Sequence, residues 1–344
     1  MRDGTYPPGS RLPTHRRLMA EFGTSPVTLQ RAFDHLVEQG YVTTVAKHGT
    51  FVAERLPDSC CYGLVFHQRA SGPVHNRFWS TLLREGQAWD DGHGRRFDCF
   101  FIADGEGAAA DRRRLAADVA DGRLAGLVFA NVPFYLQQPA ISPILTAGLP
   151  RVCFGGMAGD EQRYGASILV PDDEDVIRES FTWFAGQRRK RVAAFINTAR
   201  AQVWRSYLPA LHRAGLETRD TWWIGFPPIS DVADAVRVTT RLLFDRRPHE
   251  RPDALLIDDD NLVPWVTAGL AESGLAIPGE LSVMAHANVP GPTPAAVPCR
   301  RYGFDGRELL AAAIGELERL RRGGQPQMRQ VPARVLVETD GTVC

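Results

Sequence analysis

The chain contains almost no lysine, because only Lys47 and Lys190 are lysines among its 40 basic residues. A fold that binds pyridoxal phosphate, or that forms a Schiff base with a carbonyl substrate, needs a lysine in its active site. Lys47 lies in a turn near the N-terminus, and Lys190 lies in a basic run directly before a predicted strand. Neither position suits a Schiff base, so this class of enzyme is excluded.

Other catalytic signatures are missing as well. No GxGxxG segment follows a predicted strand and opens a helix, which argues against a dinucleotide-binding enzyme. No GxSxG nucleophile elbow is present, although spacing alone leaves a nucleophilic triad open. The scattered histidines show no spacing typical of metal ligands: His67, His75, His93, His212, His249 and His286. We therefore expect no enzyme, no metal and no other cofactor.

Cysteine pairs and long apolar runs are also absent. The six cysteines are scattered without a CxxC pair, which favours free thiols in a reducing cytoplasm over a disulfide framework. The adjacent Cys60 and Cys61 leave a redox-sensing role open. No apolar run approaches about 18 residues, and no signal peptide is recognisable at the N-terminus. We expect a cytoplasmic protein that makes no contact with a membrane.

The charge balance excludes a general attraction to nucleic acid. With 40 basic and 40 acidic residues the net charge is zero, so DNA can be contacted only through a local patch. The 344 residues exceed one ordinary domain, and a chain with 44% hydrophobic and 23% charged residues has a globular composition. Two or three folded units are therefore expected.

Residues 1–53 begin with the pattern of a helix-turn-helix. Thr14 is a candidate N-cap of a short first helix. Ser25 followed by Pro26 starts a second helix, because serine caps free N–H groups and proline at the first helical position loses no hydrogen bond. Apolar side chains then recur at the spacing of one helical face until Gly40, which supplies a left-handed C-terminal stop.

Two short strands, 41–45 and 50–52, follow the second helix around a turn. Helix, turn, helix and hairpin is the order of a winged helix-turn-helix. The turns of the second helix that would reach base edges in the major groove of DNA carry four outward residues, Val27, Thr28, Gln30 and Arg31. Lys47 and His48 at the tip of the wing are placed to contact the DNA backbone or minor groove. Ordinary surface charge on a small helix pair is the alternative.

This segment resembles the DNA-binding domain of the GntR family, whose pattern runs PGxxLPSxRxLAxxxGVSRxTVRxAxxxLxxxGxxxxxxGxGTFV. The matches in register are Pro8-Gly9, Leu12-Pro13-Thr14, Arg16, Leu18, Phe22-Gly23, Ser25, Thr28-Leu29, Arg31-Ala32, Leu36, Gly40 and Gly49-Thr50-Phe51-Val52. The resemblance implies DNA contacts at Arg16, Ser25, Thr28 and the wing around His48 and Gly49.

The segment departs from the family pattern at three positions. Pro26 and Gln30 stand where the family has arginines, and Lys47 replaces the first glycine of the wing. The operator sequence of the family therefore cannot be carried over.

The family's first helix has no room before this segment, because the chain offers only a few residues ahead of it. Without that helix, the apolar faces of Leu18, Phe33 and Leu36 are expected to be exposed. We expect a start upstream of Met1. A sensor whose DNA-binding head is incomplete is the alternative.

From residue 62 onward short apolar runs alternate with helical stretches. This alternation is typical of parallel sheets that are covered on both faces. About 280 residues are too many for one six-stranded sheet, so two α/β lobes are expected, with clefts outside the carboxyl ends of the strands. The expected strands are 62–66, 97–102, 126–129, 151–154, 167–170, 192–196, 254–257 and 281–285. The expected helices include 78–89, 109–119, 176–185, 207–214, 231–244 and 262–272.

The body resembles the effector domain of the LacI/GalR family over nearly its whole length. The resemblance rests on the order and spacing of 76–86, 125–129 with 147–152, 191–196, 252–260 and 276–283. It implies a periplasmic-binding-protein-like fold. The combination of head and body is similar to regulators of the arabinose-repressor type.

By this resemblance Asn76, Phe78 and Trp79 of the first lobe face a ligand cleft, together with Asp260 of the second lobe. Such a set suits a sugar, because carboxylates and amides bind hydroxyls while aromatic faces cover C–H surfaces. Core packing of the two aromatic residues is the alternative, and for Asp260 the alternative is the N-cap of a helix.

Two positions depart from an ordinary sugar site. Val203 occupies the place of the family's hydroxyl-binding arginine, and Ala287 occupies the place of an aspartate. Arg205 is a candidate replacement, as are Gln202 and Trp204, although a displacement of two residues turns a helical side chain to another face. A modified sugar, a glycoside or a less hydroxylated molecule is therefore expected.

The predicted fold class is α/β. A small N-terminal winged helix-turn-helix domain (1–53) and a linker (54–61) precede a two-lobed periplasmic-binding-protein-like body with parallel sheets (62–344). We expect a repressor of carbohydrate-metabolism genes that binds double-stranded operator DNA as a homodimer. Its partner in solution is expected to be a small-molecule effector, a sugar or a sugar-like compound.

Overall fold

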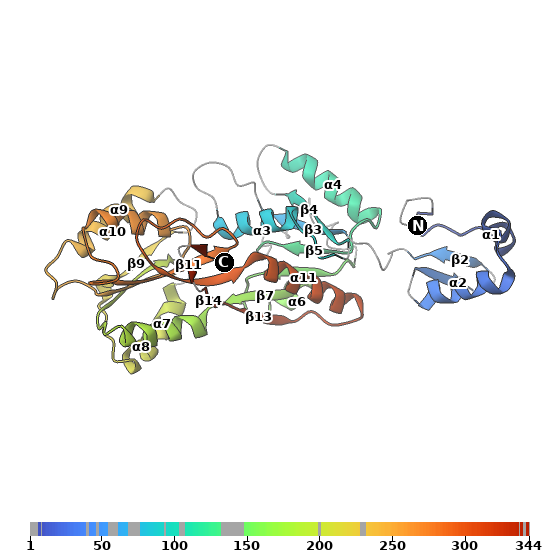
Figure 1. Ribbon diagram of the computed structural model, residues 1–344. Coiled ribbons are helices and arrows are strands. Elements are labelled where there is room, and N and C mark those ends of the chain that lie inside the picture. The colour runs from blue at the N-terminus through green and yellow to red at the C-terminus, as the bar shows by residue number, and fades with distance from the viewer. Residues whose placement is uncertain are drawn as a thin grey trace. The chain divides into compact units, whose positions relative to one another are not determined.

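The computed structural model confirms an α/β protein with two largely parallel sheets and a small N-terminal domain (Figure 1). It describes residues 6–7, 9–38, 41–45, 48–53, 61–67, 76–92, 94–102, 107–131, 148–198, 201–227, 232–336, 338–339 and 342–343. No helix in these ranges is both long enough and apolar enough to cross a membrane. These ranges also contain no group of three or more His, Cys, Asp or Glu side chains arranged to hold a metal ion.

The N-terminal domain has the predicted order of two helices and a hairpin. Its elements are His15–Phe22 (α1), Pro26–Glu38 (α2), Val42–Val45 (β1) and Gly49–Val52 (β2). The two strands pair antiparallel, and the hairpin packs on the helices through a small core. The buried residues of this core are Leu12, Leu18, Leu29, Phe33, Val42 and Val52.

Both helices begin where the sequence predicts, but they are capped differently. The Ser25 hydroxyl accepts a hydrogen bond from the Thr28 N–H at 3.2 Å, as expected of a serine N-cap. Thr14 is the N-cap residue of α1, yet its side chain forms no capping hydrogen bond. Between the helices Gly23 has a φ of 60°, a left-handed conformation that glycine adopts without strain. The predicted stop at Gly40 lies outside the described residues.

The first sheet of the body has six strands in the order β13-β7-β6-β5-β3-β4. β3 pairs in parallel with β4 and β5, and all of its residues are buried, as is typical of a strand covered on both faces. The strands are Cys61–Phe66 (β3), Arg96–Phe101 (β4), Gly126–Phe129 (β5), Arg151–Phe154 (β6), Ser167–Asp172 (β7) and Met328–Pro332 (β13). Helices next to these strands in the chain are Arg77–Gln87 (α3), Ala108–Ala120 (α4), Asp160–Tyr164 (α6) and Gly306–Arg321 (α11).

The second sheet also has six strands, in the order β14-β12-β11-β10-β8-β9. All neighbours are parallel except β14, which pairs antiparallel with β12. Figure 1 shows α9 and α10 on one side of this sheet and α7 and α8 on the other. The strands are Val192–Asn197 (β8), Trp223–Phe226 (β9), Ala254–Ile257 (β10), Ser282–Val289 (β11), Arg300–Asp305 (β12) and Arg334–Leu336 (β14). The helices are Glu174–Gly186 (α7), Ala201–Arg213 (α8), Ala233–Phe244 (α9) and Val263–Glu272 (α10).

The predicted strands and helices of the body all occur. The elements α6, β9, β12, α11 and the edge strands β13 and β14 are not predicted. β12 is hidden in the sequence because it begins with two arginines. Arg301 is nevertheless only 3% exposed, since its guanidinium group donates to the carbonyl of Thr293 at 2.6 Å. A charged residue at the start of a buried strand therefore masks the strand pattern.

The contacts within the chain divide it into two compact units. The first comprises Met1–Arg69, Gly86–Ile168 and Ala313–Gln327, and the second comprises Ala70–Glu85, Leu169–Ala312 and Met328–Cys344. The division runs through β7 and groups most of α3 with the second unit. The predicted linker, 54–61, lies outside the described residues except for Cys61, the first residue of β3.

Candidate functional site

The start of α2 presents the side chains that the sequence places toward DNA. Val27 is 64% exposed, and Thr28, Gln30 and Arg31 are exposed as well, whereas Leu29 is buried in the domain core. The observed exposure agrees with the amphipathic pattern of the helix. Contact of these four residues with DNA stays a prediction.

Some polar groups at this surface are already engaged within α2. The hydroxyl groups of Ser25 and Thr28 lie 2.9 Å apart and share a hydrogen bond, and Gln30 Nε2 donates to Asp34 Oδ1 at 2.8 Å. Exposed Arg31 forms no ion pair with any described residue, and the same holds for Arg16, which is exposed on α1. Two guanidinium groups are thus available for phosphates or base edges.

The wing depends on a glycine and on an arginine that the sequence does not single out. Gly49 has a φ of 110°, and a Cβ atom at this position would lie 2.9 Å from Nε of Arg11. Arg11 forms a backbone bridge with Phe51, so its guanidinium group lies against the base of the wing. No sequence pattern marks an arginine in the segment before α1. His48 is exposed, and Lys47 lies outside the described residues.

An open apolar groove of about 500 Å³ lies in the N-terminal domain. Phe22 on this groove is 63% exposed, which is unusual for a large apolar side chain. The predicted exposure of Leu18 and Phe33 is wrong, because both are buried by the hairpin and by each other's helix, and Leu36 is half-buried. Phe22 is therefore a large exposed apolar side chain on the groove, whereas Val27, Val37 and Val45 are exposed elsewhere in the domain.

In the second unit, Asn76 organises the start of α3. Its Oδ1 atom accepts a hydrogen bond from the Trp79 N–H at 3.2 Å, and its carbonyl accepts from the Ser80 N–H at 3.0 Å. Asn76 therefore caps the first turn of the helix, a role that the sequence analysis does not assign to it. Phe78 and Trp79 in that turn are half-buried.

A hydrogen bond joins the start of α3 to the loop after β10, and both segments belong to the second unit. The Arg77 N–H donates to Asn261 Oδ1 at 3.1 Å, across 184 positions of sequence. Asn261 is held in turn by Asp259, whose Oδ1 accepts from its backbone N–H at 2.9 Å and from its Nδ2 at 2.6 Å. The contact brings the segments of Asn76 and Asp260, which the sequence assigns to one site, close together.

Asp260 is a buried carboxylate that is only partly satisfied. Its side chain is 2% exposed, and its Oδ2 atom accepts two hydrogen bonds of 3.3 Å from the backbone N–H and Nδ2 of Asn288. Oδ1 of Asp260 and Oδ1 of Asn288 have no hydrogen-bond partner among the described residues. Two adjacent buried acceptors without donors favour a ligand with hydroxyl or amine hydrogens, or ordered water.

The alternative role of Asp260 as a helix N-cap is wrong. The N-cap residue of α10 is Leu262, and no side chain forms a capping hydrogen bond there. The burial of Asp260 thus serves no helix terminus.

Two further carboxylates follow β10 and are tied to its neighbour β8. Asp258 accepts from the Asn197 N–H at 2.9 Å and from the indole N–H of Trp204, and Asp259 accepts from Asn197 Nδ2 at 2.9 Å. Neither Asp259 nor Asp260 forms an ion pair with a described residue. Because the carboxyl ends of parallel strands meet at one edge, these groups form an acidic edge made by β8, β10 and β11.

The candidate replacements for the missing arginine lie on α8. Val203 is 46% exposed and Arg205 is exposed, while Trp204 between them is 1% exposed and donates to Asp258. No described contact joins Arg205 to the acidic edge. The side chain of Gln202 is not among those that the structure describes.

Asn288 is one of the residues of this edge that no sequence pattern marks. Ala287, in the place of the family's aspartate, is fully buried in β11, and the next residue supplies the amide that faces Asp260. The only sequence signal is an asparagine directly after the lost aspartate. Asn197 and Asn261 are missed for the same reason, because amides outside a motif carry no pattern.

Comparisons with known proteins match the N-terminal segment and the rest of the chain separately. The profile of the family described as "Bacterial regulatory proteins, gntR family" matches residues 1–52. The histidine utilization repressor of Pseudomonas aeruginosa is 30% identical over 123 residues, which are 36% of this chain and 42% of that protein. The chain therefore spans less than half the length of this curated relative.

Solved structures of LacI-family regulators share the fold of the body. The crystal structure of a LacI-family regulatory protein from Chloroflexus aggregans has a TM-score of 0.60 and 18% identity, and covers 83% of this chain and 99% of its own. A LacI-family regulator from Arthrobacter sp. FB24, in complex with lactose, has a TM-score of 0.59 and 16% identity, with coverages of 80% and 97%. The chain thus combines a winged helix-turn-helix domain of the gntR family, at its N-terminus, with a body that has the fold of LacI-family regulators.

Proposed function

We propose that the protein is a ligand-responsive transcription regulator of the cytoplasm, a repressor and not an enzyme. The exposed polar start of α2 supports DNA binding, and the partly satisfied acidic edge of the second sheet supports ligand binding. The hydrogen bond from Arg77 to Asn261 carries the proposal, because it brings together the two segments expected to hold the effector.

The DNA site is proposed to act in pairs. A homodimer presents two recognition helices, so the operator should be a two-fold pseudo-palindrome whose half-site spacing follows the symmetry of the protein. The other residues of the site are proposed to contact the DNA backbone or to form the wing. The full proposed set is Arg16, Ser25, Val27, Thr28, Gln30, Arg31, Lys47, His48 and Gly49.

The effector is proposed to be a sugar or sugar-like molecule that donates hydroxyl hydrogens to Asp260 and Asn288. Their free Oδ1 atoms support this choice, since a buried acceptor without a donor costs free energy until a ligand or water satisfies it. Phe78 or Trp79 would cover the apolar face of such a ligand. The lactose complex of the Arthrobacter protein is consistent with a carbohydrate in this fold.

The usual mode of holding a free aldose does not fit this chain well. Val203 supplies no guanidinium group, Ala287 supplies no carboxylate, and Arg205 is exposed without a described contact to the acidic edge. A modified sugar, a glycoside or a less hydroxylated compound is therefore proposed over an ordinary aldose.

The proposal is tested by thermal denaturation against a panel of sugars, glycosides and nucleosides, because a ligand that binds the native state raises its apparent stability. A compound that raises the melting temperature should then change operator affinity by roughly 5- to 150-fold in fluorescence anisotropy. Stabilisation by no compound, or by a compound without any effect on operator binding, would count against ligand-responsive regulation.

A second candidate function is a ligand-binding module whose head does not bind an operator. The open groove beside Phe22 favours it, because an incompletely packed head presents its recognition helix less rigidly. Genomic footprinting separates the two. Ligand-induced stabilisation with no protected DNA would favour the module, and protection of a symmetric site would favour the regulator.

A further inference from the structure

A second cavity, of about 330 Å³, lies entirely within the second unit. It is formed at the amino ends of β11 and β12, whereas the acidic edge lies at the carboxyl ends. Val283 on the cavity and Asn288 at the acidic edge are five residues apart on β11, which is roughly 16 Å in a strand. The cavity is therefore separate from the proposed effector site.

The walls of the cavity are apolar and contain flat surfaces. They are built by Trp183, Pro278, Val283, Pro298, Val335 and Leu336. An indole ring and two proline rings offer faces for a planar or cyclic molecule. None of the described residues that line the cavity is a carboxylate, so no described residue of its wall neutralises a positive charge.

Among the described residues that line the cavity, Arg300 is the one that is charged. It is half-buried, its Cζ atom lies 5.2 Å from the centre of the Trp183 ring, and it forms no ion pair with a described residue. A cation that is partly removed from water next to apolar walls attracts an anion more strongly than an exposed one does.

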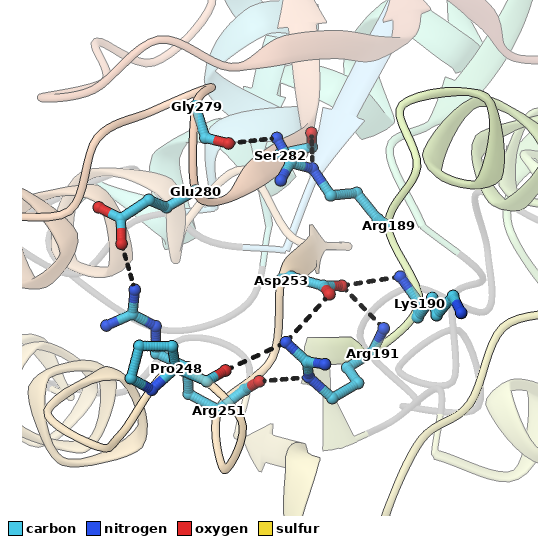
Figure 2. Close-up of polar contacts among 9 residues, drawn as sticks. All are labelled: Arg189, Lys190, Arg191, Pro248, Arg251, Asp253, Gly279, Glu280 and Ser282. Atoms are coloured by element: carbon cyan, nitrogen blue, oxygen red, sulfur yellow. Dashed lines mark hydrogen bonds and ion pairs between the residues drawn. The ribbon is translucent and has the colours of Figure 1, made fainter.

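Three neighbouring arginines differ from Arg300, because each already has partners (Figure 2). Arg189 donates to Ser282 Oγ and to the carbonyl of Gly279, both at 2.9 Å. Arg251 forms an ion pair with Glu280 at 2.6 Å.

The third of these arginines, Arg191, forms an ion pair with Asp253 at 3.1 Å. These arginines stabilise the loops at the amino ends of the strands. Unlike these three arginines, Arg300 has no ion-pair partner among the described residues, and this difference suggests that it binds a ligand.

We propose that this cavity is a second ligand site, which binds a small organic anion with a planar apolar body, such as an aromatic carboxylate. The carboxylate pairs with the guanidinium group of Arg300, and the ring lies against Trp183 and the prolines. The cavity volume is near the lower end of the range for ligand pockets, which suits a single ring with a few substituents. Because the cavity and the acidic edge lie at opposite ends of β11, the anion and the effector can be bound at the same time.

The probe is benzoate, titrated into the full chain by calorimetry, with benzamide as a neutral molecule of the same shape. Benzoate is expected to bind at least about tenfold more tightly than benzamide. Arg300→Gln should weaken benzoate binding by about tenfold and leave benzamide unchanged, whereas Arg246→Gln, an exposed arginine away from the cavity, should change neither. The comparison of the two probes on the unaltered chain does not depend on whether a variant folds.

Cys299 locates the binding event, since it is a buried thiol that lines the cavity. Benzoate is expected to slow its modification by methyl methanethiosulfonate, measured by peptide mass spectrometry, and to leave the rate at Cys99 unchanged. The proposal is overturned if millimolar benzoate does not bind, if benzamide binds equally well, or if bound benzoate fails to protect Cys299. Asp260→Ala should leave benzoate binding intact, which separates this site from the effector site.

Discussion

Glu316 in the first unit and Asp260 in the second are equally buried, each with 2% of its surface exposed, but their surroundings differ. Glu316 accepts hydrogen bonds of 2.6 Å from both Ser167 Oγ and Arg319, and one of 3.2 Å from Gln327. Asp260 accepts two bonds of 3.3 Å through one oxygen, and its other oxygen has no partner among the described residues.

Glu316 and Asp260 are equally buried but differ in their hydrogen bonding. Glu316 ties α11 to β7 and to the segment after α11, and every partner comes from the chain itself. Asp260 has one oxygen that accepts no hydrogen bond from a described residue, and a buried acceptor without a donor costs stability in the absence of a ligand. The difference indicates a structural carboxylate in the first unit and supports the ligand-binding role proposed for the one in the second.

The largest effect is expected for Asp260→Ala, which should weaken binding of the identified effector by about 3 kcal/mol, since hydrogen bonds to a charged group are the strong ones. Calorimetric titration measures the loss. Operator affinity without ligand should stay nearly unchanged, and Glu316→Gln should leave effector affinity as it is. Unaltered effector affinity in Asp260→Ala would show that Asp260 does not bind the effector and would contradict the difference in role between Asp260 and Glu316.

The reverse experiment tests the structural role of Glu316. Glu316→Ala should lower the free energy of unfolding by about 2 kcal/mol, because Ser167 and Gln327 lose their acceptor while half-exposed Arg319 regains water. Urea denaturation measures this loss. Glu318→Ala on the same helix, which breaks only a surface ion pair with Arg95, should cost less than about 1 kcal/mol. Equal costs for both variants would contradict the assignment.

A third test concerns the N-terminal domain, where the partners of the polar groups are expected to come from DNA. Arg31→Ala should weaken operator binding by about 1–2 kcal/mol and relax the sequence preference, as loss of a base contact does. Arg17→Ala, an exposed arginine on α1 outside the predicted set, is the control. Both losses are measured by anisotropy at fixed salt. An equal loss for both variants would indicate that Arg31 contacts phosphates and reads no base.

The smallest effect is a pH dependence of stability through Glu316. Burial raises the pKa of its carboxyl group, but hydrogen bonds from Arg319 and Ser167 outweigh burial, so the pKa lies below its usual value. A carboxyl group whose pKa is lower in the folded state stabilises the fold above the unfolded pKa of about 4.3, and this stability is lost as the pH falls through the folded pKa. The urea midpoint should therefore decline more steeply below pH 4.3 in the unaltered chain than in Glu316→Gln. Parallel declines would show that Glu316 titrates alike in both states.

The sequence by itself determined the local order of elements and the exposed face of the head. Ser25 and Pro26 mark the start of α2 because capping acts within one turn, and the apolar stripe decides which side chains remain outward. The continuous apolar runs of β3 and β10 predict buried parallel strands, since both faces of such strands are covered. These signals act over a few neighbouring residues, so they do not depend on the tertiary fold.

Only the tertiary structure decided which polar groups meet. The Arg77–Asn261 and Ser167–Glu316 hydrogen bonds join residues 184 and 149 positions apart, and no local pattern marks either pair. Asn288 faces Asp260 because β10 and β11 are parallel neighbours in one register. Arg300 has no ion-pair partner in the part of the chain that the structure describes because of the residues that surround the start of β12. Burial and hydrogen-bond satisfaction depend on neighbours brought in by folding, which is why the amide partners at the acidic edge and the second cavity could not be seen in the sequence.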